Sequence, residues 1–385
     1  MNKKELAELK KNFSDSSDLL VLNHVVKAFV DAEKNIRCIQ SYPAHEISVE
    51  ETECLMPTFK RVLSGTMGKG LLEYAFPEEA YLEDGGQSIL YNAVQGKLKD
   101  EESVSALLEH ITNTMEYVST YAILLGHFSY TVFRKSADDQ LDPYQSHDYA
   151  FILGAICPVE VRIDGLVYNE ADNAIEKKEA YDRIVAEIPS DGFLFPTFTG
   201  RGSDVNHVLY HTRTPKKVNV SFIENVLNCH FTQTANEQKT SFHTMMEEVV
   251  ADELSYTVIT DVNEKLRDIA AEYANEPELV AMDDIHVRDV LLDSGVTEQR
   301  AEQMQQVYRE NTKDKPIAIN NVIENKTIIT APDLHISIGK NATDKVRTQC
   351  VQGRRYLLID LDDPELEING MTVRLQENQE APAET

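Results

Sequence analysis

The hydrophobic periodicity of this chain changes twice, and that change restricts its fold more than any other feature. Residues 19–39 alternate apolar and polar side chains, as half-buried strands do. From Asn219 to Tyr273 the apolar residues recur every three or four positions, which is typical of amphipathic helices. Runs rich in β-branched residues return after Ile317. The pattern predicts an α+β protein with a mixed N-terminal half, a helical middle and a small all-β module at the C-terminus.

The predicted domain boundaries follow these changes of period. The chain has 385 residues, enough for two or three domains of ordinary size. We place an N-terminal α+β domain at 1–217, a helical region with an αα-hairpin at 218–312, a β module at 313–375 and a disordered tail at 376–385.

Local patterns in the first 150 residues predict individual elements. The chain is expected to open with an amphipathic helix, because Leu6, Leu9 and Phe13 recur at helical spacing. A hairpin over residues 19–39 and helices around 50–63 and 100–118 follow. Residues 121–132 are either a strand or a buried helix, since periodicity does not separate the two. A polar loop is expected at 135–148.

Further along, Pro158 separates two β-rich runs, 149–156 and 159–167, at a point where a missing backbone donor is tolerable. Residues 191–198 are predicted to form a strand, 199–204 a turn and 205–210 a returning strand.

The helical region and the C-terminus carry clear local signals. Asp283 or Asp284 can cap a short helix that Gly295 stops, and Thr297 can cap a second helix. The pair resembles a helix-turn-helix in outline, but carboxylates on its second helix favour a structural αα-hairpin. Asn369-Gly370 predicts a type I′ hairpin turn.

Charge restricts the possible partners. There are 37 basic and 65 acidic residues, a net charge of −28, and such a field repels nucleic-acid phosphates and anionic lipid. We therefore predict no membrane contact, and any contact with DNA must be local.

Basic residues gather in two segments. Residues 199–220 hold four basic residues and one acid, and residues 313–356 hold eight and four. These clusters are candidate sites for a polyanion, with an ordinary solvated surface as the alternative reading. The candidate residues are Arg201, Arg213, Lys216, Lys217, Lys340, Lys345, Arg347, Arg354 and Arg355.

The segment Ser64-Gly65-Thr66-Met67-Gly68-Lys69-Gly70 suggests a phosphate-binding loop. It departs from the P-loop pattern, which needs glycine where Leu63 stands and a hydroxyl residue where Gly70 stands. We interpret the segment as a helix stop followed by a turn, with an anion site as the alternative.

A second constellation is the group Arg201, Asp204, His207 and His211, which lies beside glycine turns suited to a pocket. The two histidines would share a zinc ion if they lay on a helix, but the flanking residues predict a strand. Four residues of strand separate the rings by about 13 Å, too far for one ion. We predict neither a metal nor a cofactor, and the group remains a candidate enzymatic pocket of unrecognised class.

Cysteine use and the N-terminus bear on location. The five cysteines are odd in number and never form Cys-x-x-Cys, which favours a reducing compartment. Residues 1–11 lack the apolar run of a signal peptide. We predict a cytoplasmic protein, with the nucleoid as an open alternative within the cytoplasm.

Several stretches together resemble an uncharacterised family of Gram-positive bacteria, known only as a domain of unknown function (4317). The stretches are Met1–Glu5, Leu63–Lys69, Ile156–Val159, Gly192–Pro196, Val208–Tyr210 and Ile368–Gly370. The resemblance covers nearly the whole chain, and it implies a bacterial cytoplasmic protein without implying any activity.

In the order of its elements the chain is also similar, more remotely, to a bacterial nucleoid-associated protein family. That resemblance implies association with the chromosome. Our leading hypothesis is a non-enzymatic, nucleoid-associated-like protein that contacts DNA or a DNA-bound partner through the basic clusters. An enzyme with a site around 193–211, or a regulatory or structural interaction protein, is the alternative, and a dimer is left open.

Overall fold

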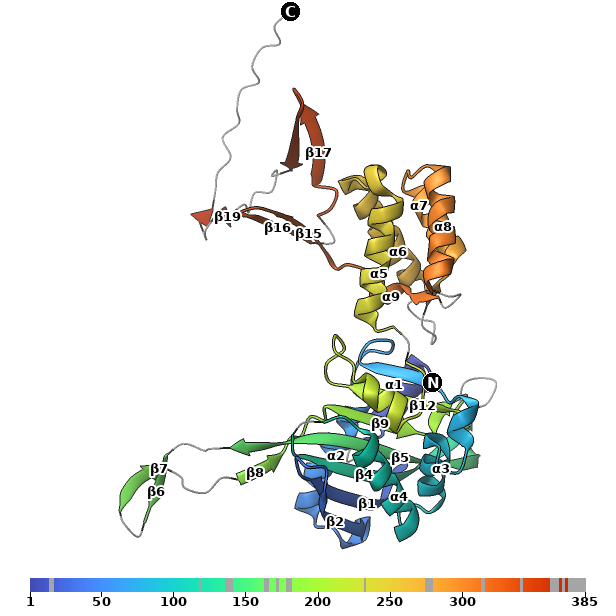
Figure 1. The fold of residues 1–385 in the computed structure, drawn as a ribbon, viewed down its shortest axis with the longest axis vertical. Coiled ribbons are helices and arrows are strands. Elements are labelled where there is room, and N and C mark those ends of the chain that lie inside the picture. The colour runs from blue at the N-terminus through green and yellow to red at the C-terminus, as the bar shows by residue number, and fades with distance from the viewer. Residues whose placement is uncertain are drawn as a thin grey trace, which may run out of the picture. The chain divides into compact units, whose positions relative to one another are not determined.

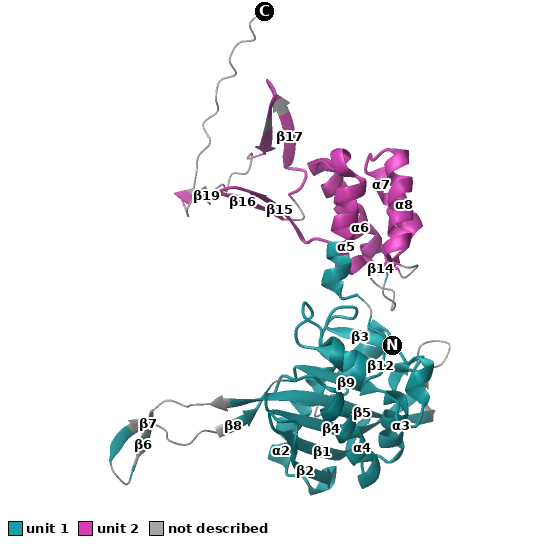
Figure 2. Ribbon diagram, viewed as in Figure 1, with its two compact units in different colours: residues 1–240, 275–280 teal, residues 241–274, 281–385 magenta. Residues whose placement is uncertain are grey.

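In a computed structural model, the chain forms two compact units. They are residues 1–240 with 275–280 and residues 241–274 with 281–385 (Figure 2). The structure describes residues 1–13, 17–117, 119–135, 141–162, 166–170, 173–177, 182–231, 233–273, 280–312, 316–339, 342–360, 367–368 and 371–372.

The first unit is built on a large antiparallel sheet (Figure 1). Its strands, from edge to edge, are β2 (Ile36–Pro43), β1 (Leu20–Val30), β4 (Tyr121–Lys135), β5 (Leu141–Arg162), β9 (Asp191–Phe195), β12 (His207–Thr212) and β3 (Leu71–Ala75). β8 (Asp182–Val185) pairs with the far end of β5, and β6 (Leu166–Asn169) and β7 (Ala174–Lys177) form a separate hairpin.

Alternation along the strands gives the sheet two apolar faces. In β4, Ile123 and Leu125 join one buried cluster, whereas Leu124 and Phe128 join the other. Residues 121–132 are therefore a strand, which settles the choice that periodicity left open. The predicted hairpin at 19–39 is also confirmed as β1 and β2, and the Asp31 carboxylate accepts backbone N–H bonds within its turn.

Helices cover both faces of this sheet (Figure 1). One face carries α3 (Gly86–Gln95), α4 (Glu101–Thr114), the 3₁₀ turn Glu78–Tyr81 and the π-helical turn Phe222–Val226. The other carries α1 (Lys3–Lys11) and α2 (Val49–Val62), with the 3₁₀ turn Ala44–Glu46 just before α2. The three predicted helices in this half are confirmed as α1, α2 and α4.

The loop predicted at 135–148 was wrong for the residues that the structure describes at its end. Residues 141–148, expected in a polar loop, belong to β5 and pair with β4. β5 also runs through Pro158 without a break. The missing N–H of Pro158 is tolerated because the pairing with β4 ends there and the pairing with β8 begins at Val159.

The predicted strand over 191–198 is divided at the cis Phe195-Pro196 peptide into β9 and β10 (Thr197–Thr199). β10 pairs with β11 (Gly202–Asp204), so the turn between them has two residues, Gly200 and Arg201. Both have positive φ, 60° and 59°, which matches a type I′ turn. Glycine suits that conformation, and arginine adopts it at a cost.

The second unit contains most of the predicted helical region, from Ser241 onward. Its helices are α6 (Tyr256–Glu272), α7 (Asp284–Asp293), α8 (Glu298–Thr312) and α9 (Ile319–Val322), with the 3₁₀ turn Ala251–Glu253; α5 (Ala235–Val249) spans the boundary between the units. Asp283 caps α7 as predicted, and Gly295 has φ of +83°. The Thr297 hydroxyl, however, donates to Glu253 instead of capping α8.

The β module consists of separate antiparallel hairpins in the described residues. They are β15 (Lys326–Ala331) with β16 (Leu334–Gly339), β17 (Val346–Val351) with β18 (Arg354–Ile359), and β19 (Glu367–Ile368) with β20 (Met371–Thr372). β14 (Ile317–Ala318) pairs instead with β13 (Ala281–Met282), which precedes α7 in the chain. Ile368 pairs with Met371, as a two-residue connection requires. Asn369, Gly370 and the tail predicted at 376–385 lie outside the described residues.

Residues 218–231 belong with the first unit, although the sequence pattern grouped them with the helical region. Phe222, Ile223 and Leu227 are fully buried in the same cluster as the inner faces of α3 and α4. The His110 ring on α4 also bonds to the Val226 carbonyl at 2.9 Å. Helical periodicity alone does not show against which element a helical turn packs.

Candidate functional site

The charged side chains of α1 are sorted onto two sides of the helix. Glu5 caps the helix with Asn2 and also accepts the Gly200 N–H at 2.6 Å. Glu8 pairs with Arg201 and accepts the Tyr130 hydroxyl at 2.8 Å. Both carboxylates therefore bind the turn between β10 and β11. Lys3, Lys10 and Lys11 lie on a different side of the helix.

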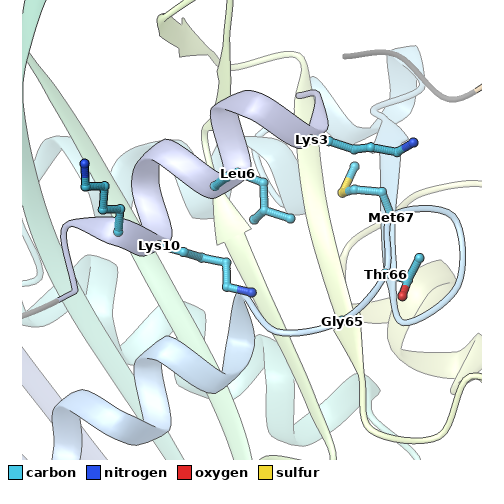
Figure 3. Close-up of a pocket in the computed structure, with 8 residues that line it drawn as sticks. Lys3, Leu6, Lys10, Gly65, Thr66 and Met67 are labelled. Carbon is cyan, nitrogen blue, oxygen red and sulfur yellow. The ribbon is translucent and has the colours of Figure 1, made fainter. Parts of the chain in front are cut away.

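Three of those lysines line a cavity of about 580 Å³ against the loop that follows α2. In Figure 3, Lys3 extends past Met67 and Lys10 points toward the chain at Gly65. The full lining is Lys3, Leu6, Ala7, Lys10, Lys11, Gly65, Thr66 and Met67.

The loop from Ser64 to Gly70 is a compact turn between α2 and β3. The Thr66 carbonyl accepts the N–H groups of Lys69, Gly70 and Leu71 at 3.0–3.2 Å. Gly65 has φ of +141° and Gly68 of +80°, conformations that only glycine adopts readily. The predicted helix stop and turn is therefore present.

A second cavity, of about 370 Å³, adjoins the first, because Gly65 and Thr66 line both. Its lining is Arg61, Ser64, Gly65, Thr66, Lys69, Gly70, Ile188, His211, Thr212, Arg213 and Pro215. We call the two cavities together the basic cleft. Its cations are Lys3, Lys10, Lys11, Arg61, Lys69 and Arg213, and its lining includes no carboxylate.

The cations of the second cavity are nearly free of competing anions. Arg61 approaches Glu187 at 3.8 Å, but both side chains are more than half exposed, so this pair contributes little. Within the described part of the chain, the side chains of Lys69 and Arg213 have no hydrogen-bond or ion-pair partner.

His211 lines the second cavity as a buried, unsatisfied polar group. The residue is 5% exposed, and neither ring nitrogen makes a hydrogen bond of good geometry in the described residues, although the nearby Ser64 backbone opposes part of the effect of burial on the pKa of the ring. Burial lowers the pKa of His211 to about 4, so the ring is neutral at pH 7. Leaving such a group without partners costs about 1–3 kcal/mol.

The structure separates the four residues of the predicted enzymatic pocket. Asp204 and His207 pair at 2.8 Å, and His211 lies four residues along the same strand, about 13 Å away by the strand rise. Arg201 binds Glu8 and the Phe133 carbonyl instead. Of the four, only His211 lines the basic cleft.

The side chain of Arg201 is 22% exposed and holds the β10–β11 turn on α1. We expect Arg201→Ala to lower the free energy of unfolding by about 1–2 kcal/mol, because Glu8 loses its charged partner. Chemical denaturation measures this loss. Lys4→Ala, which changes an exposed residue of the same helix, is the control and should change stability by less than about 0.5 kcal/mol.

The remaining residues of the first basic cluster lie near the cleft. Arg213 lines it, and Lys216 and Lys217 are exposed just beyond Pro215, another lining residue.

The second basic cluster is dispersed where the structure describes it. Arg347 and Arg354 are exposed on one face of the β17–β18 hairpin, separated by about four residues of strand. Lys345 lies just before β17, and its carbonyl accepts the Asp360 N–H at 2.7 Å. Lys340 and the side chain of Arg355 lie outside the described residues. In α8, which would be the recognition helix of a helix-turn-helix, the Arg300 guanidinium donates hydrogen bonds to the Val249 carbonyl and to the Asp252 carboxylate.

Sequence reasoning missed four cations of the cleft, Lys3, Lys10, Lys11 and Arg61, whereas Lys69 lies in the segment for which an anion site was the alternative reading. Counting charge along the sequence hid them, because acidic residues are their neighbours in α1 and α2. Lys3 and Lys10 are two helical turns apart on the side of Leu6, and that spacing could have shown a basic stripe.

Among the described residues, no three His, Cys, Asp or Glu side chains gather closely enough to hold a metal ion. None of the described helices combines the length and the apolar character needed to cross a bilayer.

Fold and cleft together define an α+β protein in which an antiparallel sheet, covered by helices on both faces, carries a cleft lined by cations. The chain belongs to the family described as Domain of unknown function (DUF4317), whose model matches residues 1–371. No curated protein and no solved structure matches it. The remote resemblance to nucleoid-associated proteins is therefore unsupported by these comparisons.

Proposed function

We propose that this protein is a non-enzymatic binding protein that contacts DNA, or a protein bound to DNA, through the basic cleft of its first unit. The observation that carries the proposal is the gathering of six cations from α1, α2, the 64–70 loop and the segment after β12, with no carboxylate in the lining.

This arrangement addresses the main electrostatic objection to such a function. A net charge of −28 repels a polyanion at long range, but salt screens that repulsion beyond about 10 Å. Phosphates that touch the cleft would meet cations at short range, where the attraction is strongest. Lys216 and Lys217 would extend the contact beyond the cleft.

The composition of the lining favours binding over catalysis. It supplies ammonium and guanidinium groups, hydroxyls and one imidazole, but neither a carboxylate nor a thiol. General acid–base mechanisms most often use an imidazole, but burial lowers the pKa of the one in this lining, His211, to about 4, which makes it a weak base.

The test is the affinity of the full chain for a short DNA duplex, measured by fluorescence anisotropy over a range of salt concentrations. We expect binding at low salt that weakens steeply as salt rises. The triple variant Lys3→Ala/Lys10→Ala/Lys11→Ala should reduce the slope of log K against log salt by up to about 2–3, since each lost phosphate contact removes about 0.9.

Lys4→Ala is the matched control, because Lys4 is on the same helix but does not line the cleft. Undetectable binding at low salt would refute direct contact with DNA. Equal slopes for the wild type and the triple variant would refute the assignment of the contact to this cleft.

A further inference from the structure

We propose that the second cavity of the basic cleft, the one lined by His211, is a binding site for a single phosphate group, either free phosphate or a phosphomonoester. This inference goes beyond the proposed contact with DNA and does not require it. The first support is the convergence of three cations from three different elements: Arg61 in the last turn of α2, Lys69 in the loop and Arg213 after β12.

The second, independent support is the imidazole of His211. A neutral imidazole offers one N–H donor and one acceptor nitrogen; neither makes a hydrogen bond of good geometry in the described residues, although the residue is 95% buried and the Ser64 backbone lies beside the ring. A phosphate that keeps one proton offers both acceptor oxygens and an O–H donor. Such a ligand in the cavity would satisfy a polar group that the fold alone leaves unsatisfied.

The loop adds backbone donors at the same place. The N–H groups of Gly65 and Thr66 have no acceptor within the described part of the chain, and both residues line the cavity. Successive N–H groups in a glycine-containing turn are a frequent cradle for anions. The segment lacks the P-loop hydroxyl, so the site is not one for a magnesium nucleotide of that kind.

The experiment is calorimetric titration of the full chain, in a buffer free of phosphate, with inorganic phosphate in one arm and adenosine monophosphate in the other. We expect saturable binding to one site. Lys69→Ala and Arg213→Ala should each weaken it about tenfold or more, since each removes a charge-assisted contact. Lys99→Ala, an exposed lysine before α4, should leave it unchanged.

His211→Leu provides a second readout. It should weaken phosphate binding about tenfold, while the melting temperature without phosphate stays the same or rises, because the variant removes an unsatisfied group. A histidine with a purely structural role would instead give a lower melting temperature and unchanged affinity.

The two arms identify the source of the phosphate group, since the tighter ligand indicates whether the site takes free phosphate or a phosphomonoester. The absence of saturable binding in both arms would overturn the proposal, as would equal affinities in the wild type, Lys69→Ala and Arg213→Ala. Neither titration contains DNA, so a failure of the DNA proposal would leave this test intact, and the reverse is also true.

Discussion

Phe128→Ala should lower the free energy of unfolding by about 3–5 kcal/mol. Phe128 is fully buried, and its ring centroid lies 5.4 Å from those of Phe13, Phe59 and Phe151. These neighbours come from the segment after α1, from α2 and from β5, so a cavity here would loosen the packing of both helices that contribute to the basic cleft.

Chemical denaturation of the full chain measures this effect. Leu82→Ala, at a side chain that is 67% exposed, is the control and should cost less than about 0.5 kcal/mol. A loss of less than about 1 kcal/mol for Phe128→Ala would contradict the assignment of this ring to the packing between the sheet and the two helices.

Acidification from pH 6.5 to pH 4 should destabilise the fold by up to about 6 kcal/mol through two histidines. Burial lowers the pKa of His127 to about 4, and it does the same for His211. Unfolding restores an ordinary pKa near 6.5, so the unfolded chain binds more protons within this window and stability rises with pH across it. Each histidine contributes about 3 kcal/mol, which is present above pH 6.5 and lost as the pH falls toward 4.

Denaturant titrations at several pH values between 4 and 7.5 measure this dependence. His211→Leu removes one of these groups and should therefore reduce the pH-dependent loss by about 3 kcal/mol. Burial also lowers the pKa values of His24 and His110, which adds to the loss that remains in this variant. Stability that stays constant from pH 6.5 to 4, or an unchanged profile in His211→Leu, would show that these rings are not held neutral by burial. Asp191 acts in the opposite direction, because burial raises the pKa of its carboxyl.

The sequence predicted the class of fold because hydrophobic period depends on local geometry. Alternation at 19–39 predicted the β1–β2 hairpin, and apolar spacing predicted helices around 50–63 and 100–118, which correspond to α2 (Val49–Val62) and α4 (Glu101–Thr114). It did not predict the extent of β5, since polar residues such as those at 141–148 can pair with a neighbouring strand as well as form a loop. It also did not predict that Phe222 packs beneath α4, because that contact joins residues more than 100 positions apart.

The candidate site was less predictable for a related reason. The turn at Ser64–Gly70 and the strand character of the segment that ends at His211 were both visible in the sequence. Their convergence depends on the pairing of β12 with β3, which places His211 opposite Leu71, directly after the loop. Arg201 is the opposite case. It lies in a basic segment of the sequence, but in the fold it forms an ion pair with Glu8 and does not line the cleft.

The most direct test of the basic cleft is to locate a bound anion. Crystals of the full chain soaked in tungstate, a tetrahedral dianion with strong anomalous scattering, should show a peak within hydrogen-bond distance of His211 and Lys69. Anomalous peaks found only elsewhere on the molecule, or none at all, would contradict the claim that these residues form an anion site.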